Sequence, residues 1–211
     1  MTPRSLTRRS LTRRAALATV VLTGAVVLTA CGSSDDGSAS GAHGTPATPS
    51  ASAAAHNAQD VAFAQGMIPH HQQALEMAQL AAGRAASAQV KDLASRIEKA
   101  QDPEIRTMTG WLTSWGEDVP MAGMDHSGHT GMSGMSGMMS EADMTALKKA
   151  TGKDFDTRFL TLMAEHHQGA VAMATTEQEK GRSGAAKALA DDIVTAQNAE
   201  IKEMKQLLGS K

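Results

Sequence analysis

The sequence predicts an all-α protein, a four-helix bundle built from two copies of one helical hairpin. Apolar residues recur at helical spacing through four long segments, and the last two segments repeat the first two at a constant offset of 96 residues. Strand-forming patterns are nearly absent, because the chain has no Tyr, only three Phe and no run of alternating apolar and polar residues.

The repeat centres on the segment Met67–Ala78, which returns as Met163–Ala174. Each copy contains two adjacent histidines, with methionines at helical spacing around them. A register kept over a long stretch without a gap indicates one structural unit built twice. The offset of 96 residues also relates Phe63 to Phe159, Ala94 to Ala190, Ile97 to Ile193, Gln101 to Gln197, Glu104 to Glu200, Ile105 to Ile201, Met108 to Met204 and Leu112 to Leu208.

The first helix is expected over about 58–82, where core-facing residues alternate in spacings of four and three from Phe63 to Met77. The second is expected over about 87–115, which completes the first hairpin. The second hairpin covers 141–211 and begins with a short helix at 141–150. The bundle domain then spans 58–211, and the residues 116–140 connect its two hairpins.

The N-terminal residues 1–30 read as a signal peptide, because a head with five arginines precedes a short apolar run rich in small residues. The run ends in Leu-Thr-Ala-Cys, which resembles the bacterial lipobox and predicts lipidation of Cys31, the only cysteine. Residues 31–57 are Gly, Ser, Ala, Thr and Pro without an apolar period, as expected for a flexible, disordered tether to the lipid anchor. Both the general secretory and the twin-arginine export routes fit this segment.

The expected location is therefore the outer face of the cytoplasmic membrane or the cell envelope, with the membrane as a partner through Cys31. Without residues 1–30 the chain has 15 basic and 22 acidic residues, a formal charge of −7. This balance argues against nucleic-acid binding, which requires a basic face. The oligomeric state is left open.

The four histidines are expected to lie in one layer of the bundle. The first hairpin turns near position 85, so residues near position 100 on its second helix stand level with the histidines at positions 70 and 71. The same count applies to the second hairpin. The residues predicted to share this layer are His70, His71, Gln101 and Glu104 from the first hairpin, and His166, His167, Gln197 and Glu200 from the second.

Buried imidazoles and carboxylates are costly unless they have partners, and a metal ion would supply one. Thioether and imidazole donors together favour copper, and thioether selects the soft Cu(I) ion. Met67 and His71 lie four residues apart and can share an ion, as can Met163 and His167. Glu104 and Glu200 would then orient the ring N–H groups. The alternative is a metal-free core in which Gln and Glu satisfy the histidines, and methionines at such positions are usually core residues.

The connection between the hairpins places methionine or histidine at about every third position among Gly and Ser. Nothing in this segment can build a core, so packing does not explain its methionines. We expect additional copper contacts there, against the alternatives of an oxidant-scavenging segment or a low-complexity spacer. The candidate residues are Met121, Met124, His126, His129, Met132, Met135, Met138 and Met139.

Several enzyme classes are excluded by spacing. No Glu is followed three residues later by His, which a ferritin-like di-iron site requires. The chain also lacks His-Glu-x-x-His, Cys-x-x-Cys-His, a nucleophile elbow and a phosphate-binding loop. The sequence therefore predicts a binding protein and no enzyme.

The motif Phe-x3-Met-x2-His-His-x2-Ala-x2-Met-Ala, followed by Gln-x2-Glu-Ile-x2-Met-x3-Leu, resembles the domain of unknown function 305 family over about residues 58–211. The resemblance implies an exported four-helix bundle of ferritin-like shape, and some members of that family bind copper through Met and His. Carried over residue by residue, it implies the ligand candidates Met67, His70, His71, Met77, Met163, His166, His167 and Met173.

The function predicted from these observations is an exported, lipid-anchored copper-binding protein for copper sequestration, tolerance or transfer. Other copper-handling proteins of the envelope are the expected partners. The alternatives are a metal-free bundle that serves as an envelope interaction module, and a copper or haem redox protein. Because imidazole must be neutral to ligate, binding by the bundle is expected to weaken as the pH falls through about 6–7.

Overall fold

A computed structural model describes residues 56–120 and 136–209 of the chain. The predicted signal peptide, Cys31 and most of the tether lie outside these residues. So do six of the candidates in the connection, namely Met121, Met124, His126, His129, Met132 and Met135.

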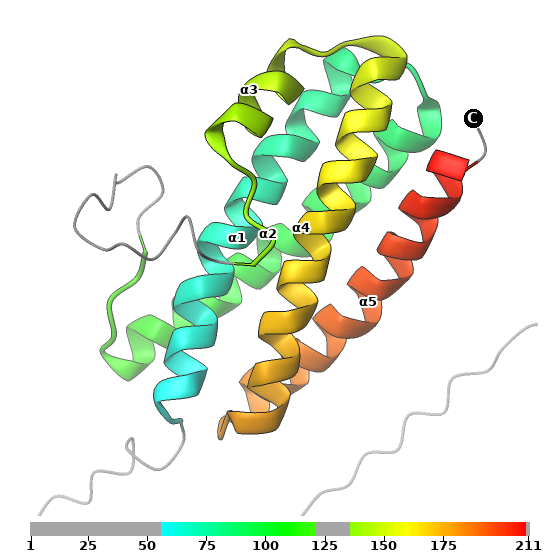
Figure 1. Ribbon diagram of the computed structural model, residues 1–211. Helices are drawn as coiled ribbons and strands as arrows, with labels where there is room; N and C mark the ends of the chain where they lie inside the picture. The colour runs from blue at the N-terminus through cyan, green and yellow to red at the C-terminus, as the bar shows by residue number, and fades with distance from the viewer. Residues whose placement is uncertain (1–55, 121–135, 210–211) are drawn as a thin grey trace, which may run out of the picture. The chain divides into compact units, whose positions relative to one another are not determined.

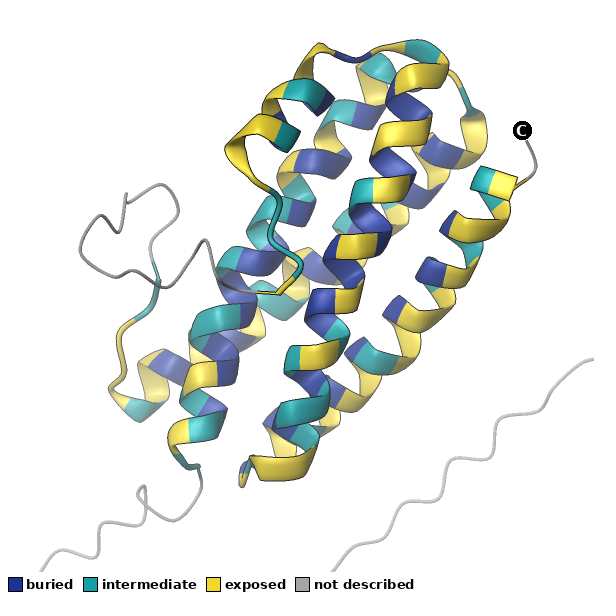
Figure 2. Cartoon of the chain, viewed as in Figure 1, coloured by how far each residue is buried: buried dark blue, intermediate teal, exposed yellow. Residues whose placement is uncertain are grey.

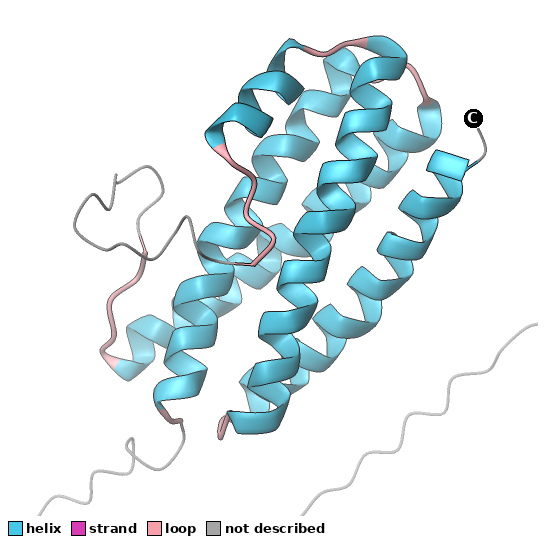
Figure 3. Cartoon of the chain, in the orientation of Figure 1, coloured by secondary structure: helices cyan, strands magenta, loops and turns pink. Residues whose placement is uncertain are grey.

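Five helices form the described part, and the predicted all-α class is confirmed (Figure 1). They are α1 (Ala58–Arg84), α2 (Ala88–Trp115), α3 (Glu141–Lys149), α4 (Gly152–Lys180) and α5 (Gly184–Gly209). Figure 3 shows these helices joined by loops, with no strand in the part of the chain that the structure describes. None of these helices is long and apolar enough to cross a membrane.

The four long helices form two antiparallel hairpins, α1 with α2 and α4 with α5, and the hairpins meet mainly through α1 and α4. Helices α1 and α4 also run antiparallel. Ala85, just after α1, pairs with Gly152 at the start of α4, while Asn57 before α1 donates to the carbonyl of Lys180 at the end of α4. Since the repeat makes α1 and α4 equivalent, an approximate two-fold axis crosses the bundle between them.

The core divides into two clusters along the bundle axis, and Figure 2 shows that buried residues occupy the inward faces of the helices. One cluster, near the start of α4, includes Met77, Leu93 and Met163. The other, near the start of α1, includes Met67 and Met108. The histidine pairs fall between the two clusters in sequence on both α1 and α4, so a polar layer separates two apolar halves.

Each hairpin turn is held by a buried aspartate of the other hairpin. Asp156 on α4 accepts hydrogen bonds from the backbone N–H groups of Ala86 and Ser87, at 3.1 and 3.0 Å. Asp60 on α1 accepts from the N–H groups of Arg182 and Ser183, and the bond from Ser183 is 2.8 Å long. Asp60 and Asp156 are 0% and 2% exposed and stand at equivalent positions of the repeat. We call these two contacts the clasps.

Candidate metal centre

The two histidine pairs meet at the centre of the bundle, as predicted. His70 on α1 and His166 on α4 lie across the two-fold axis, with their ring centroids 3.7 Å apart. The exposed fraction of His70 is 0% and that of His166 is 1%. The repeat thus brings its own equivalent residues into contact.

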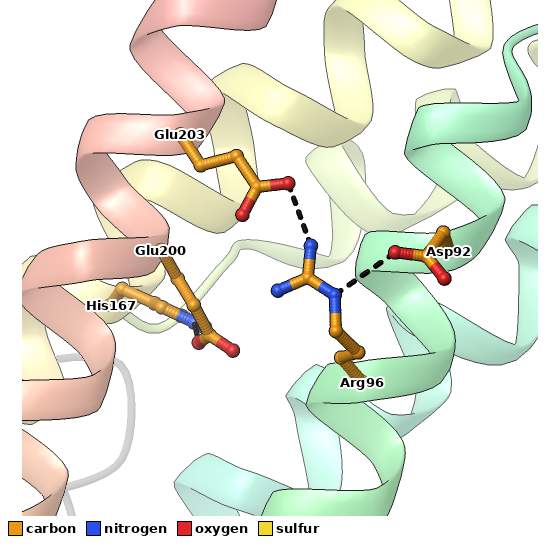
Figure 4. A network of polar contacts seen from close by, with 5 residues as sticks. All are labelled: Asp92, Arg96, His167, Glu200 and Glu203. Carbon is orange, nitrogen blue, oxygen red and sulfur yellow. Dashed lines mark hydrogen bonds and ion pairs between the residues drawn. The ribbon is translucent and has the colours of Figure 1, made fainter. Parts of the chain in front are cut away.

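The other histidine of each pair turns toward a glutamate of the partner helix in its own hairpin. His71 Nε2 lies 2.8 Å from Glu104 Oε2, and His167 Nε2 lies 2.7 Å from Glu200 Oε2. Figure 4 shows the second of these pairs, between α4 and α5. A carboxylate can only accept, so each Nε2 carries the proton and the Nδ1 of a neutral ring keeps a free lone pair. The predicted His–Glu contacts are confirmed.

The layer contains an unusual number of buried polar atoms without hydrogen-bond partners. Native proteins leave few such atoms, and each one calls for an explanation. Gln101 and Gln197, only 2% and 3% exposed, each leave the side-chain oxygen without a partner. The imidazole atoms without a partner are Nδ1 and Nε2 of His70, Nδ1 of His71, Nδ1 and Nε2 of His166, and Nδ1 of His167.

Burial keeps the central histidines neutral. Burial, followed by repulsion from His71, lowers the pKa of His70 to about 3, although the nearby Ser136 backbone raises it. Burial and the adjacent His70 likewise lower the pKa of His166 well below its ordinary value. The expectation of weakened binding near pH 6–7 took the rings to be unperturbed, and for these two residues the pKa is lower than that. Their lone pairs stay available in moderate acid.

The methionines of the motif are placed on both sides of the histidine layer. Met67 and Met77 are ten residues apart on α1, about 15 Å along the helix, so they cannot bind the same ion together. Met77 instead shares a core cluster with Met163 of the other hairpin. Met173, which is partly buried, packs against the cluster that contains Met67. The antiparallel order of α1 and α4 therefore gives each side of the layer one thioether from each hairpin.

The donor set suits a soft metal ion better than a hard one. Within residues 56–120 and 136–209, no three His, Cys, Asp or Glu side chains gather closely enough to hold a metal ion. An ion at the layer could take donors of another kind beside imidazole. The buried thioethers on either side are such donors, and imidazole with thioether is the combination that favours copper.

Two features of the site were missed from sequence. Position 139 is tied to α1 by two hydrogen bonds with Gln73, which brings Met138 and Met139 near the layer. Gly169 on α4 meets the backbone of Ser136. A weak signal was available, because Gln73 and Gly169 occupy equivalent positions but differ, as several other positions of the motif do, whereas the histidines are preserved.

Comparison with known proteins agrees with this geometry. The profile of the family described as Domain of unknown function (DUF305) matches residues 60–208. The chain belongs to the DUF305 family. No curated protein matches the chain.

Solved structures of DUF305 proteins share the fold. One from Streptomyces coelicolor, thought to be secreted, is 36% identical with a TM-score of 0.64, and the match covers 72% of this chain and 93% of that one. A DUF305 fragment from Deinococcus radiodurans is 33% identical with a TM-score of 0.62, covering 74% of this chain and 98% of that one.

A third neighbour, CopM, is known in metal-bound forms. Its Cu(I)-bound structure is 34% identical with a TM-score of 0.58, and the match covers 72% of this chain and 96% of that one. Its Cu(II)-bound structure is 35% identical with a TM-score of 0.61 and the same coverage. CopM has also been crystallised with silver. Copper binding therefore occurs among proteins of this fold and degree of similarity.

Proposed function

We propose that this protein binds copper, with a preference for Cu(I), and that it stores or transfers the ion in the cell envelope without being an enzyme. The observation that carries the proposal is the layer of four buried imidazoles with six ring nitrogens lacking partners, flanked by buried thioethers. Such a layer is costly in a metal-free core, and copper would satisfy it. The metal-bound forms of CopM support the same conclusion.

The hydrogen bonds of the four histidines indicate which ring nitrogens would bind copper. His71 and His167 would bind through Nδ1, because their Nε2 atoms are held by Glu104 and Glu200. His70 and His166 have both ring nitrogens free. Thioethers from both hairpins lie on each side of the layer, which favours two copper ions related by the two-fold axis. Met138 and Met139, the candidates of the connection that the structure describes, would serve as auxiliary ligands.

Anaerobic titration with Cu(I) against a competing chelator tests the proposal. The full chain is expected to withdraw copper from the chelator, whereas a variant with His70, His71, His166 and His167 replaced by Ala should lose the tight sites. His56→Ala is a matched control, because His56 stacks on Trp115 away from the layer, with ring centroids 4.4 Å apart. Failure of the unaltered chain to compete would favour a metal-free interaction module instead.

Export and anchoring are part of the same proposal. The basic head, the apolar run and Leu-Thr-Ala-Cys support a lipid at Cys31, and one neighbour is thought to be secreted. Cys31→Ala is expected to release the protein from the membrane fraction or to block its processing. Unchanged membrane association on fractionation would refute the anchor.

A further inference from the structure

The end of the connection between the hairpins lies across the histidine layer. We call residues 136–139 the strap. Figure 1 shows it leading toward α3 from mid-height on α1 and α4. Two contacts fix its place: one with α1, and one with the turn of α4 that carries His166.

The contact with α1 is a closed pair of hydrogen bonds. The Gln73 side-chain amide donates to the carbonyl oxygen of Met139 at 3.0 Å, and the N–H of Met139 donates to Gln73 Oε1 at 2.7 Å. Both polar groups of one side chain are thus used to hold one residue of the strap. Gln73 stands one helical turn beyond His70, so this attachment lies beside the layer.

The contact with α4 is a direct approach of two backbones. A Cβ on Gly169 would lie 2.0 Å from the carbonyl oxygen of Ser136, so any larger residue would displace the strap. Gly137, which has a φ of +84°, also lies against Gly169, because a Cβ on Gly137 would lie 2.8 Å from the Cα of Gly169. A Cβ on Gly137 would come within 2.8 Å of the carbonyl oxygen of His166. The strap therefore lies directly against the turn of α4 that carries His166.

The strap lies against one of the positions at which the two copies of the repeat differ. Gln73 and Gly169 stand at the same position of the two copies, three residues after His70 and His166. In the first copy, the side chain of Gln73 forms two hydrogen bonds with the strap. In the second copy, Gly169 has no side chain and leaves room for the backbone of the strap. The histidines themselves are preserved in both copies. The difference at this position thus matches the strap, which crosses a two-fold axis and cannot be symmetrical itself.

We propose that the strap is a gate over the α1–α4 side of the histidine layer, that Gln73 and Gly169 are its positioning residues, and that copper enters and leaves on this side when the strap lifts. The identity of the ion that passes the gate rests on the proposed copper function, whereas the existence of the gate does not. On the opposite side Glu104 and Glu200, with side chains 19% and 14% exposed, stand between their histidines and solvent.

The gate can be tested on the full metal-free chain by acylation of imidazoles with diethyl pyrocarbonate, mapped by mass spectrometry. Gly169→Ala should displace the strap, because the added methyl group would collide with the backbone of Ser136. Gln73→Ala should loosen the strap by removing two hydrogen bonds, without creating a collision. Gly110→Ala is the matched control, since a Cβ there meets nothing within 4 Å. Both strap variants should raise the labelling rate of His70 and His166 by about tenfold or more, as expected for local opening, and the control should not.

The labelling pattern decides between a gate and a weakened bundle. A selective rise at His70 and His166 supports the gate. An equal rise at all four histidines would mean that the whole bundle opens, and no rise in either variant would mean that the strap does not cover the layer; both results overturn the proposal.

Release of bound Cu(I) to a chelator provides a second readout and should be faster in both strap variants. If the unaltered chain binds no copper, the proposed function fails while the labelling still decides the gate. If it binds copper and the variants neither label nor release faster, only the gate fails.

Discussion

The histidines of the layer have two chemical roles, set by what their ring nitrogens contact. His70 and His166 touch each other, whereas His71 and His167 are each oriented by a glutamate through Nε2. A carboxylate that fixes the tautomer of a ligating histidine typically contributes 10–100-fold to metal affinity, so its role is measurable.

Glu200→Gln is expected to weaken tight Cu(I) binding by about 10–100-fold, because an amide can donate as well as accept and no longer fixes the ring of His167. Competition titration measures the change. Glu203→Gln is the control: Glu203 lies one turn further along α5 and pairs instead with Arg96, at 2.6 Å (Figure 4). Equal losses in the two variants would show that surface charge, rather than the His–Glu contact, sets the affinity.

A buried carboxyl at one clasp gives the fold a pH dependence of its own. Glu177 is fully buried on α4, and its carboxyl group lies beside the side chains of Asp60 and Gln59. Burial and the hydrogen bond and charge of Asp60 raise the pKa of Glu177 to about 8. Burial also works to raise the pKa of Asp60, but hydrogen bonds from Glu177 and from three backbone N–H groups together lower it. Glu177 is therefore protonated and donates to Asp60 near neutral pH.

Because the pKa of Glu177 is higher in the folded state than in the unfolded chain, folding retains a proton that the unfolded chain loses above about pH 4.5. Its contribution to stability is complete below that pH and is lost as the pH rises through about 8, by at most about 1.4 kcal/mol per pH unit. Glu177→Gln should flatten the dependence, as measured by urea unfolding at several pH values. The exposed Glu179→Gln should leave the curve unchanged, and identical curves for the two variants would contradict the assignment.

At the scale of elements, the clasps join each hairpin turn to the other hairpin. Asp156→Ala should cost about 2–4 kcal/mol of unfolding free energy, because it removes two charge-assisted hydrogen bonds and leaves the N–H groups of Ala86 and Ser87 without their acceptor. Chemical denaturation measures the loss. Asp154→Ala, on the exposed side of the same helix turn, removes a surface pair with Arg158 and an acidic side chain from the first turn of α4, and should cost about 1 kcal/mol or less. A comparable loss in both would rule out the clasp.

The helices could be predicted from sequence because their signals are local and repeated. The expected bounds of α1, α2 and α3 differ from those observed by at most two residues. Counting residues from the hairpin turn also predicted that His71 and Glu104 lie at the same height in the hairpin. These inferences need only helix geometry and the register of the repeat.

The clasps and the strap could not be predicted in the same way, because they depend on how one hairpin lies against the other. From sequence, an aspartate in the first turn of a helix is expected only to stabilise the helix N-terminus. Asp60 does this as well, since it belongs to the capping box of α1. Its clasp role appears only when the turn at Ser183 arrives beside it. The pKa of His70 was likewise out of reach, since it depends on burial by residues from the other hairpin.

For the whole molecule, the two-fold relation explains why the repeat preserves its histidines. A duplicated hairpin that packs antiparallel to itself places equivalent residues either in contact at the axis, as with His70 and His166, or at equal distances on opposite sides of it. The motif methionines follow the second pattern. Met67 lies on one side of the layer and its equivalent Met163 on the other.

This arrangement leads to a test of copper capacity by substitution of single thioethers. Met67→Leu and Met163→Leu should each remove about half of the tightly bound Cu(I), because each takes one thioether from one side of the layer, and the double variant should remove nearly all of it. Leu is close to Met in volume, so each change should cost the fold less than about 1.5 kcal/mol. Met108→Leu is the control, being equally buried in the cluster of Met67 but not part of the histidine motif. Bound copper per chain after gel filtration measures the result. Complete loss in either single variant would show one shared ion at the axis, and an equal loss in Met108→Leu would show that core packing rather than ligation is being measured.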